Sequence, residues 1–373
     1  MGSIFGYYFY IIGKVCNITQ SATYKEAWQD TLGGDTGSIA VATVNMLKPA
    51  LGNLAYSMII ADTFQSLSST IGIIEITRTE SLLIMTMIAI LPLCLMKNLD
   101  TLAPFSILGT LGILLTATCM GIRYFDGTYD INRDGRFVTD LSSELQPSFG
   151  TYNNGSMTNG GVLVFITMVY EAFVAHYNSP RFLTELKQPT MSRFASLVII
   201  AFGSSSLVYI IMTAFGFLTF GSNCNGYILN NYSTNDPLAT ICRIAIAFSV
   251  LFTYPIVFVG FRDGILDILE LPPHLQTTNN VNVLTVVLLF IITVLAATCH
   301  DLGFINAVGG GTLATAIVFV FPAFMFRAAM KYRPLQQSTT TPSEELEIKI
   351  VLCLMVVGVI IGVIGVYVLL QFE

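Results

Sequence analysis

The chain has 373 residues, of which 54% are hydrophobic and 11% are charged. An average soluble domain has about 25% charged residues, so the apolar surface here exceeds what one compact core could bury, and lipid must be the solvent. The formal net charge of −6 comes without a basic block, which excludes a nucleic-acid-binding surface.

Apolar stretches of the length that a bilayer requires recur along the chain. Because they are continuous rather than alternating, they predict transmembrane helices and not a barrel. Nine spans are predicted, at residues 42–66, 81–96, 103–121, 160–179, 194–220, 237–260, 281–299, 303–326 and 348–370. A tenth apolar segment, Ser3 to Gly13, is too short to span and soon meets Lys14, so we interpret it as the end of a helix whose beginning is absent.

Lys and Arg are concentrated in one set of alternate loops, which the positive-inside rule assigns to the cytoplasm. The other set includes loop 122–160, which is predicted to be extracellular or lumenal. The sequons at Asn154 and Asn231 fall on this side and are predicted glycosylation sites. Cys119 and Cys224, at the outer ends of two spans, are candidates for a disulfide, with Cys299 as a competitor.

Residues 130–141 of this outer loop open like a calcium-binding loop, with Asp130, Asn132 and Asp134 followed by glycine. The bidentate acid is misplaced, because position twelve is Leu141. A solvated acidic turn is the default interpretation, and calcium binding is the alternative.

The densest polar cluster within an apolar stretch runs from Glu171 to Asn178 and is followed by Pro180. Proline cannot donate a backbone hydrogen bond and biases the preceding residue away from the helix, so a break is predicted near residues 176–179. Broken helices form the midplane sites of many secondary transporters. The substrate-binding candidates here are Glu171, His176, Tyr177 and Asn178. Alternatively, Pro180 merely ends the span and His176 and Asn178 are interfacial residues.

Two further spans contain polar side chains. Ser249 and Thr253 share one helix face before Pro255, and hydroxyl oxygens beside a freed carbonyl suit a sodium ion. The alternative is that these hydroxyls bond to their own backbone or to a neighbouring helix. In the stretch 41–64, Asn53 and Tyr56 are further substrate-binding candidates, whereas Lys48 and Asp62 could be interface anchors.

The sequence contains no motif that is typical of an enzyme active site. The Gly309–Gly311 run lacks the lysine of a phosphate loop and predicts close helix packing or a hinge. The chain has three histidines and neither a two-histidine zinc motif nor a nucleophile elbow. We therefore predict no enzymatic activity, no cofactor and no metal other than the candidate sodium.

Several stretches in order along the chain resemble one family. They are Tyr24–Trp28 with Gly33, Leu54–Asp62, Leu91–Ser106, His176–Lys187, and Thr253–Pro255 with Arg262. With these motifs the chain resembles the amino acid/auxin permease family, and within it the sodium-coupled neutral amino-acid transporter branch. The resemblance implies an all-α, LeuT-type inverted-repeat bundle that moves amino acids by alternating access. About ten of its eleven helices would be present in one polytopic domain over 1–373, with the first helix missing.

The leading hypothesis is thus secondary active transport of small, neutral amino acids, coupled to sodium or protons. The alternative is an amino-acid sensor or partner-binding membrane protein without turnover. A channel lacks a recognisable filter sequence. The predicted partners are a small amino acid and the bilayer, in the plasma membrane or in a vacuolar or lysosomal membrane. The particular amino acid, the coupling ion, the membrane and the oligomeric state are left open.

Overall fold

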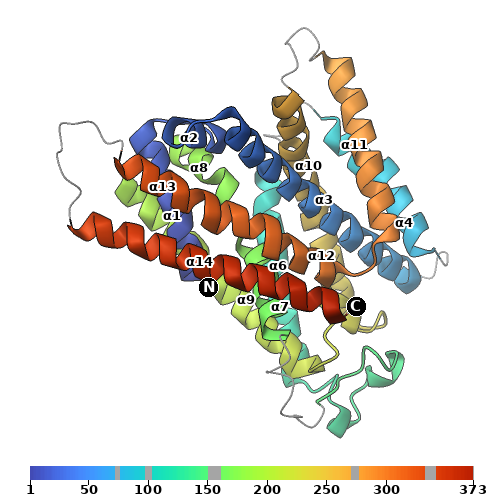
Figure 1. Cartoon of the computed structure of the whole chain (residues 1–373). Coiled ribbons are helices and arrows are strands. Elements are labelled where there is room, and N and C mark those ends of the chain that lie inside the picture. The colour runs from blue at the N-terminus through green and yellow to red at the C-terminus, as the bar shows by residue number, and fades with distance from the viewer. Residues whose placement is uncertain (72–75, 97–102, 150–160, 270–276, 332–341, 373) are drawn as a thin grey trace. The chain divides into compact units, whose positions relative to one another are not determined.

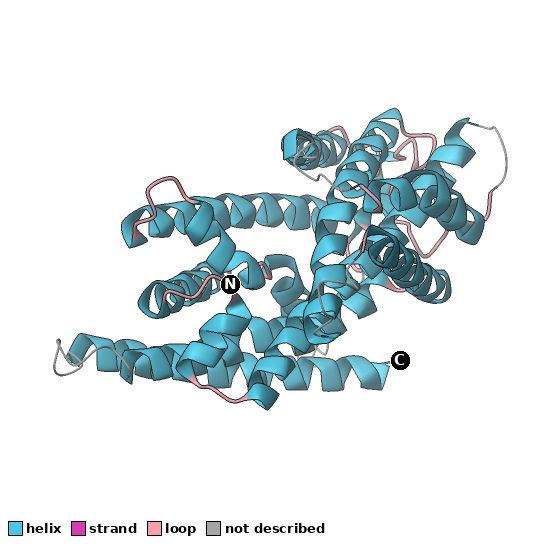
Figure 2. Ribbon diagram, turned by 90° about the horizontal axis from the view of Figure 1, so that it is seen from above, coloured by secondary structure: helices cyan, strands magenta, loops and turns pink. Residues whose placement is uncertain are grey.

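The computed structural model describes residues 1–71, 76–96, 103–149, 161–269, 277–331 and 342–372. In these ranges the chain forms helices and loops (Figure 1, Figure 2). One isolated β-bridge joins Ser148 and Gly221. The α-helices are α1 (Gly2–Thr19), α2 (Tyr24–Thr31), α3 (Asp35–Ile71), α4 (Arg78–Met85), α5 (Leu91–Cys94), α6 (Ala103–Phe125), α7 (Gly161–Phe173), α8 (Ser179–Glu185), α9 (Met191–Phe220), α10 (Pro237–Leu269), α11 (Thr278–Thr298), α12 (Leu302–Gly309), α13 (Phe321–Lys331) and α14 (Pro342–Phe372).

Seven helical stretches among the described residues are long and apolar enough to cross a membrane. They are 107–125, 161–185, 191–220, 237–266, 278–298, 302–331 and 342–371. The chain is therefore a multi-pass, all-helical integral membrane protein, as predicted. The predicted spans 42–66 and 81–96 are helical too, in α3 and in the run from α4 to α5, but they are not among the seven. Ten spans and an inverted repeat stay predictions.

The contacts between Cα atoms divide the chain into two compact units whose segments interleave along the sequence. Unit 1 comprises residues 1–48, 154–206 and 306–373, and unit 2 comprises residues 49–153 and 207–305. One boundary falls inside α3, between Lys48 and Pro49, where proline removes a helical hydrogen bond.

The core of unit 1 is a cluster of aromatic side chains around Phe5 of α1. Its ring lies 5.4 Å from the rings of both Tyr170 and Phe319, measured between centroids. The α1 helix continues to Thr19, past the expected end near Lys14. Lysine is a good helix former, and Lys14 forms an ion pair within this helix with Glu347 of α14, 2.7 Å away.

Glycines let three helical segments of unit 1 approach closely. A π-helical segment, Gly310–Ala314, packs against α7 and α14. A Cβ added at Gly310 would lie 1.8 Å from the Thr167 carbonyl oxygen of α7. On α14, a Cβ at Gly362 would lie 2.7 Å from the Gly311 carbonyl oxygen. The close packing predicted for the Gly309–Gly311 run is thus confirmed.

In unit 2, a buried polar cluster fixes the loops that follow α6 and α9. The buried carboxylate of Asp236 accepts hydrogen bonds from Arg123 and from the Tyr129 hydroxyl. Arg243 is buried as well and donates to the carbonyl oxygens of Leu229 and Tyr232, at 2.9 and 2.6 Å. Burial, and then the charge of Asp236, raises the pKa of Tyr129 above its ordinary value.

The same loops overturn the predicted glycosylation of Asn231. Its side chain is 0% exposed. The amide nitrogen donates to the carbonyl oxygens of Leu145 and Asn223, and its oxygen accepts from the Asn225 N–H. A glycan on this nitrogen would require the loop to open, so Asn231 is a structural residue. The other sequon, at Asn154, lies outside the described residues, and its glycosylation stays a prediction.

In the same region the candidate disulfide is corrected, and loop 130–141 forms a turn, which is its default interpretation. Cys119 and Cys224 are free thiols, the first buried and the second exposed. Two acidic side chains of loop 130–141 form hydrogen bonds, since Asp130 accepts from the Asn132 N–H and Asp140 accepts from Ser233 and Asn235. Within the described ranges no group of three His, Cys, Asp or Glu side chains could hold a metal ion. The loop is a hydrogen-bonded turn.

Candidate functional site

The span that contains Glu171 is broken, as the sequence predicts. Helix α7 ends at Phe173, a 3-10 turn follows at His176–Asn178, and α8 begins at Ser179. Pro180 lies in the first turn of α8, where its missing N–H costs no helical hydrogen bond. The break therefore precedes the proline, and it lies within the stretch 161–185, which is long and apolar enough to span a membrane.

Two side chains at the break form hydrogen bonds with backbone carbonyl oxygens of α1. The Nε2 atom of His176 lies 2.9 Å from the Phe5 carbonyl oxygen, and the Ser179 hydroxyl donates to the Phe9 carbonyl oxygen at 2.8 Å. His176 is 0% exposed, with the rings of Phe5, Phe9 and Phe202 around it. His176 is therefore enclosed by the helix packing of unit 1. Its role in substrate binding stays a prediction, and so does the alternative that it is interfacial.

One turn before the break, Glu171 forms an ion pair with Lys48 of α3. The Nζ–Oε1 distance is 2.5 Å, and the side chains of Lys48 and Glu171 are 8% and 13% exposed. The second carboxylate oxygen, Oε2, is buried and has no hydrogen-bond partner among the described residues. Lys48 is thus a buried partner of Glu171 and not an interface anchor, and sequence reasoning missed this role.

Tyr177 and Asn178 complete the part of the predicted site that belongs to unit 1. Both side chains are partly buried. The Asn178 N–H donates to the Ala175 carbonyl oxygen at 3.0 Å, which closes the 3-10 turn. Tyr177 is also close enough to Glu171 to interact with its charge. The ion pair of Glu171 thus lies just before the break, and the polar residues Tyr177 and Asn178 lie in the turn that forms it.

The other predicted residues belong to unit 2. Asn53 of α3 is buried, and its amide nitrogen donates to the Pro49 carbonyl oxygen at 3.0 Å. The ring of Tyr56 lies 6.5 Å from that of Tyr254 on α10, whose hydroxyl is 3.0 Å from the Ser57 Oγ. Polar side chains of α3 and α10 therefore face one another inside this unit.

Of the two candidate sodium ligands, Thr253 bonds to the backbone of its own helix, which is the alternative to sodium binding. The Thr253 hydroxyl donates to the Ser249 carbonyl oxygen of its own helix at 2.8 Å. Ser249 faces α6, where a Cβ at Gly109 would lie 2.6 Å from its Oγ. A donating hydroxyl retains its lone pairs and can still ligate a cation. The role of Ser249 and Thr253 in sodium binding therefore stays a prediction.

Asp62, considered as an interface anchor, belongs instead to an ion-paired cluster in unit 2. Its carboxylate accepts from Arg78 of α4 at 2.7 Å and from the Asn230 amide at 3.2 Å. Arg78 also donates to the Ala296 carbonyl oxygen of α11. This cluster joins α3, α4 and α11 with the loop before α10, which is a structural role.

An apolar multi-span protein whose span is interrupted beside a buried charge pair has the architecture of a membrane transporter. The family model described as "Transmembrane amino acid transporter protein" matches residues 2–370, and the chain belongs to this family. Membership identifies a transporter family and not a family of enzymes.

Curated relatives agree with this assignment. The chain is 24% identical over 350 residues to a Homo sapiens protein named "Putative sodium-coupled neutral amino acid transporter 11", covering 92% of the chain and 79% of that protein. It is 25% identical over 319 residues to the Danio rerio protein of the same name, covering 83% of the chain and 66% of that protein. The chain thus spans about two-thirds to four-fifths of the length of these relatives.

Proposed function

We propose that the chain is a secondary active transporter of small, neutral amino acids that works by alternating access and is coupled to sodium or protons. The main observation that supports this proposal is the buried Lys48–Glu171 ion pair beside the break between α7 and α8. A buried ion pair is costly to maintain within a membrane, and ionisable groups there usually serve a transport pathway.

The chemistry of the pair suits a zwitterion. An amino acid carries one carboxylate and one ammonium group, which complement Lys48 and Glu171 respectively. Exchanging the internal ion pair for two ion pairs with the substrate leaves no buried charge uncompensated. An acidic or basic substrate side chain would add an unbalanced charge, and this argues for neutral substrates. The names of the relatives support the same class.

Transport in proteoliposomes tests the proposal. The purified chain is reconstituted, and uptake of labelled neutral amino acids is measured with an inward sodium gradient, with an inward proton gradient and with neither. Uptake above the equilibrium level under one gradient is the expected result. Binding of label to the protein without accumulation under any gradient would instead indicate a sensor and would contradict transport.

For sodium coupling, Thr253→Val is expected to raise the sodium concentration that gives half-maximal uptake by about tenfold, since one oxygen ligand is lost. The measurement is uptake as a function of sodium concentration. The matched control is Thr293→Val on α11, because that buried hydroxyl donates to the carbonyl four residues earlier in the same way. Equal sodium dependence in both variants would mean that Thr253 only bonds its own backbone.

A further inference from the structure

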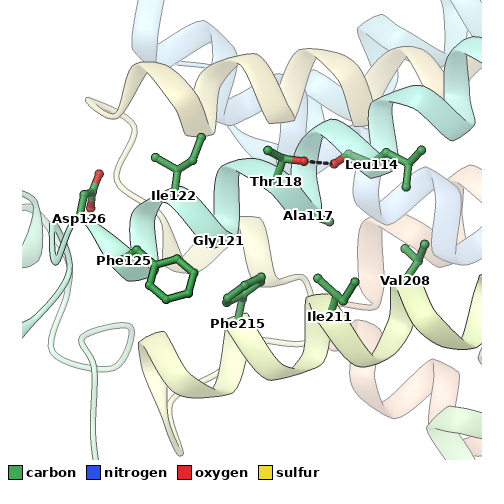
Figure 3. Close-up of a pocket in the computed structure, with 10 residues that line it drawn as sticks. All are labelled: Leu114, Ala117, Thr118, Gly121, Ile122, Phe125, Asp126, Val208, Ile211 and Phe215. Atoms are coloured by element: carbon green, nitrogen blue, oxygen red, sulfur yellow. Dashed lines mark hydrogen bonds between the residues drawn. The ribbon is translucent and has the colours of Figure 1, made fainter.

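An apolar groove of about 740 Å³ lies between α6 and the second half of α9 in unit 2 (Figure 3). This volume is within the range of about 300–1,000 Å³ that is usual for small-molecule sites. Both helices are membrane-spanning stretches. Leu114, Ile122 and Ile211 line the groove with exposed side chains. The groove therefore opens toward the hydrocarbon region of the bilayer.

Small residues of α6 form the floor of the groove. Ala117, Thr118 and Gly121 leave space that larger side chains would fill. The Thr118 hydroxyl donates to the Leu114 carbonyl oxygen of its own helix, so this polar group is already satisfied (Figure 3). At Gly121 an added Cβ would lie 3.0 Å from the Phe215 ring, so glycine is what allows this ring to approach. The floor is thus apolar and suits an acyl chain.

The end of the groove near the loop 126–149 is different, because three aromatic rings gather there. The ring centroids of Phe125 and Phe215 are 5.8 Å apart, as are those of Tyr124 and Phe215. Phe125 is 74% exposed, so much of its ring is free to meet a ligand. Clustered aromatic faces attract cations, and quaternary ammonium groups in particular.

One carboxylate, that of Asp126, lines this end of the groove, and it forms an ion pair with Arg123 at 2.8 Å. Burial alone would raise the pKa of Asp126, but hydrogen bonds from Thr128 and Arg123 hold that pKa below its ordinary value. The carboxylate is therefore ionised, and its oxygens are already engaged with Thr128 and Arg123. A cation that needs no hydrogen bond fits this end better than a primary ammonium group.

We propose that the groove binds one phosphatidylcholine molecule of the surrounding leaflet, with an acyl chain along Thr118 and Ile211 and the choline group at Phe125 and Asp126. The site is separate from the Lys48–Glu171 pair and does not depend on the transport proposal. Ordinary boundary lipid differs from this occupant, because the aromatic and acidic end selects the headgroup.

The test is lipid retention. The full chain is purified in mild detergent from membranes containing equal amounts of phosphatidylcholine, phosphatidylethanolamine and phosphatidylglycerol with identical acyl chains, and bound lipid is quantified by mass spectrometry. Phosphatidylcholine is expected to be enriched about threefold or more over each of the other two. Equal retention of the three lipids, or enrichment of phosphatidylglycerol, would overturn the headgroup assignment.

Variants separate the tail and headgroup contributions. Thr118→Trp fills the groove and is expected to abolish the retained lipid, whereas Leu115→Trp, an exposed α6 position outside the groove, should leave it unchanged. Asp126→Asn and Phe125→Leu keep the groove and should each bring the ratio of choline lipid to glycerol lipid close to that of the membrane. If Thr118→Trp misfolds, these two variants still decide the proposal, and an unchanged ratio in both refutes it.

Discussion

Replacing Glu171 by Gln is expected to lower amino-acid uptake by about a hundredfold, because it removes the carboxylate and leaves the Lys48 ammonium group buried without a partner. Removing one member of a buried ion pair usually costs about 3–5 kcal/mol. The measurement is the initial rate of uptake in proteoliposomes, together with the thermal stability of the purified variant. Both quantities are expected to fall.

The double variant Lys48→Met with Glu171→Gln distinguishes a binding role from a structural one. It removes both charges, so its thermal stability should recover toward that of the unmodified chain. Transport should not recover, because neither group of the zwitterion has its partner. The matched control is Glu185→Gln, which breaks the exposed Arg181–Glu185 pair, with side chains 72% and 57% exposed, and should change neither quantity. Recovery of uptake in the double variant would show that the pair only supports the fold.

The membrane class and the helix break could be predicted because their signals are local. Continuous apolar stretches indicate helical spans regardless of partners, and Pro180 with its polar neighbours marks the interrupted span. The Gly309–Gly311 run likewise predicted close packing, because glycine permits approach whatever the partner segment is. In each case the physical cause lies within a few residues of the observed feature.

The partners of charged and polar side chains could not be predicted, because they come from distant segments. Lys48 meets Glu171 across 123 positions of sequence, and Lys14 meets Glu347 across 333. A lysine inside an apolar stretch signals a buried partner but does not identify it. Asn231 shows the same limit, since its sequon is local and its burial depends on contacts with Leu145 and Asn223.

The Lys48–Glu171 ion pair depends on how the helices around it pack. Glu171 stays opposite Lys48 only if α7 keeps its position. That position is set by backbone-to-backbone approach against the π-helical segment Gly310–Ala314 and against α14. Side chains near the break contribute bonds to α1, but the glycines determine how close α7 can come.

Gly310→Ala is therefore expected to be among the most damaging small substitutions in the chain. The added Cβ would lie 1.8 Å from the Thr167 carbonyl oxygen and 3.0 Å from the Glu171 backbone nitrogen. Backbone atoms cannot rotate away as a side chain can, so α7 must shift, and overpacking of this severity costs more than about 3 kcal/mol. The expected result is loss of the monodisperse peak in size-exclusion chromatography or a much lower melting temperature.

Substitutions at two other glycines provide comparisons for the loss of stability expected in Gly310→Ala. Gly311→Ala should be milder, because its Cβ would meet the Val366 side chain at 2.4 Å and the Gly362 carbonyl oxygen at 3.0 Å, and the valine can adjust. Gly203→Ala on α9 has no atom within 4 Å of the added Cβ and should be neutral or slightly stabilising, because alanine restricts the unfolded chain. The melting temperatures should therefore rank Gly203→Ala highest and Gly310→Ala lowest. If Gly310→Ala and Gly203→Ala have the same melting temperature, close backbone approach does not hold α7 in place. The position of Glu171 must then have another cause.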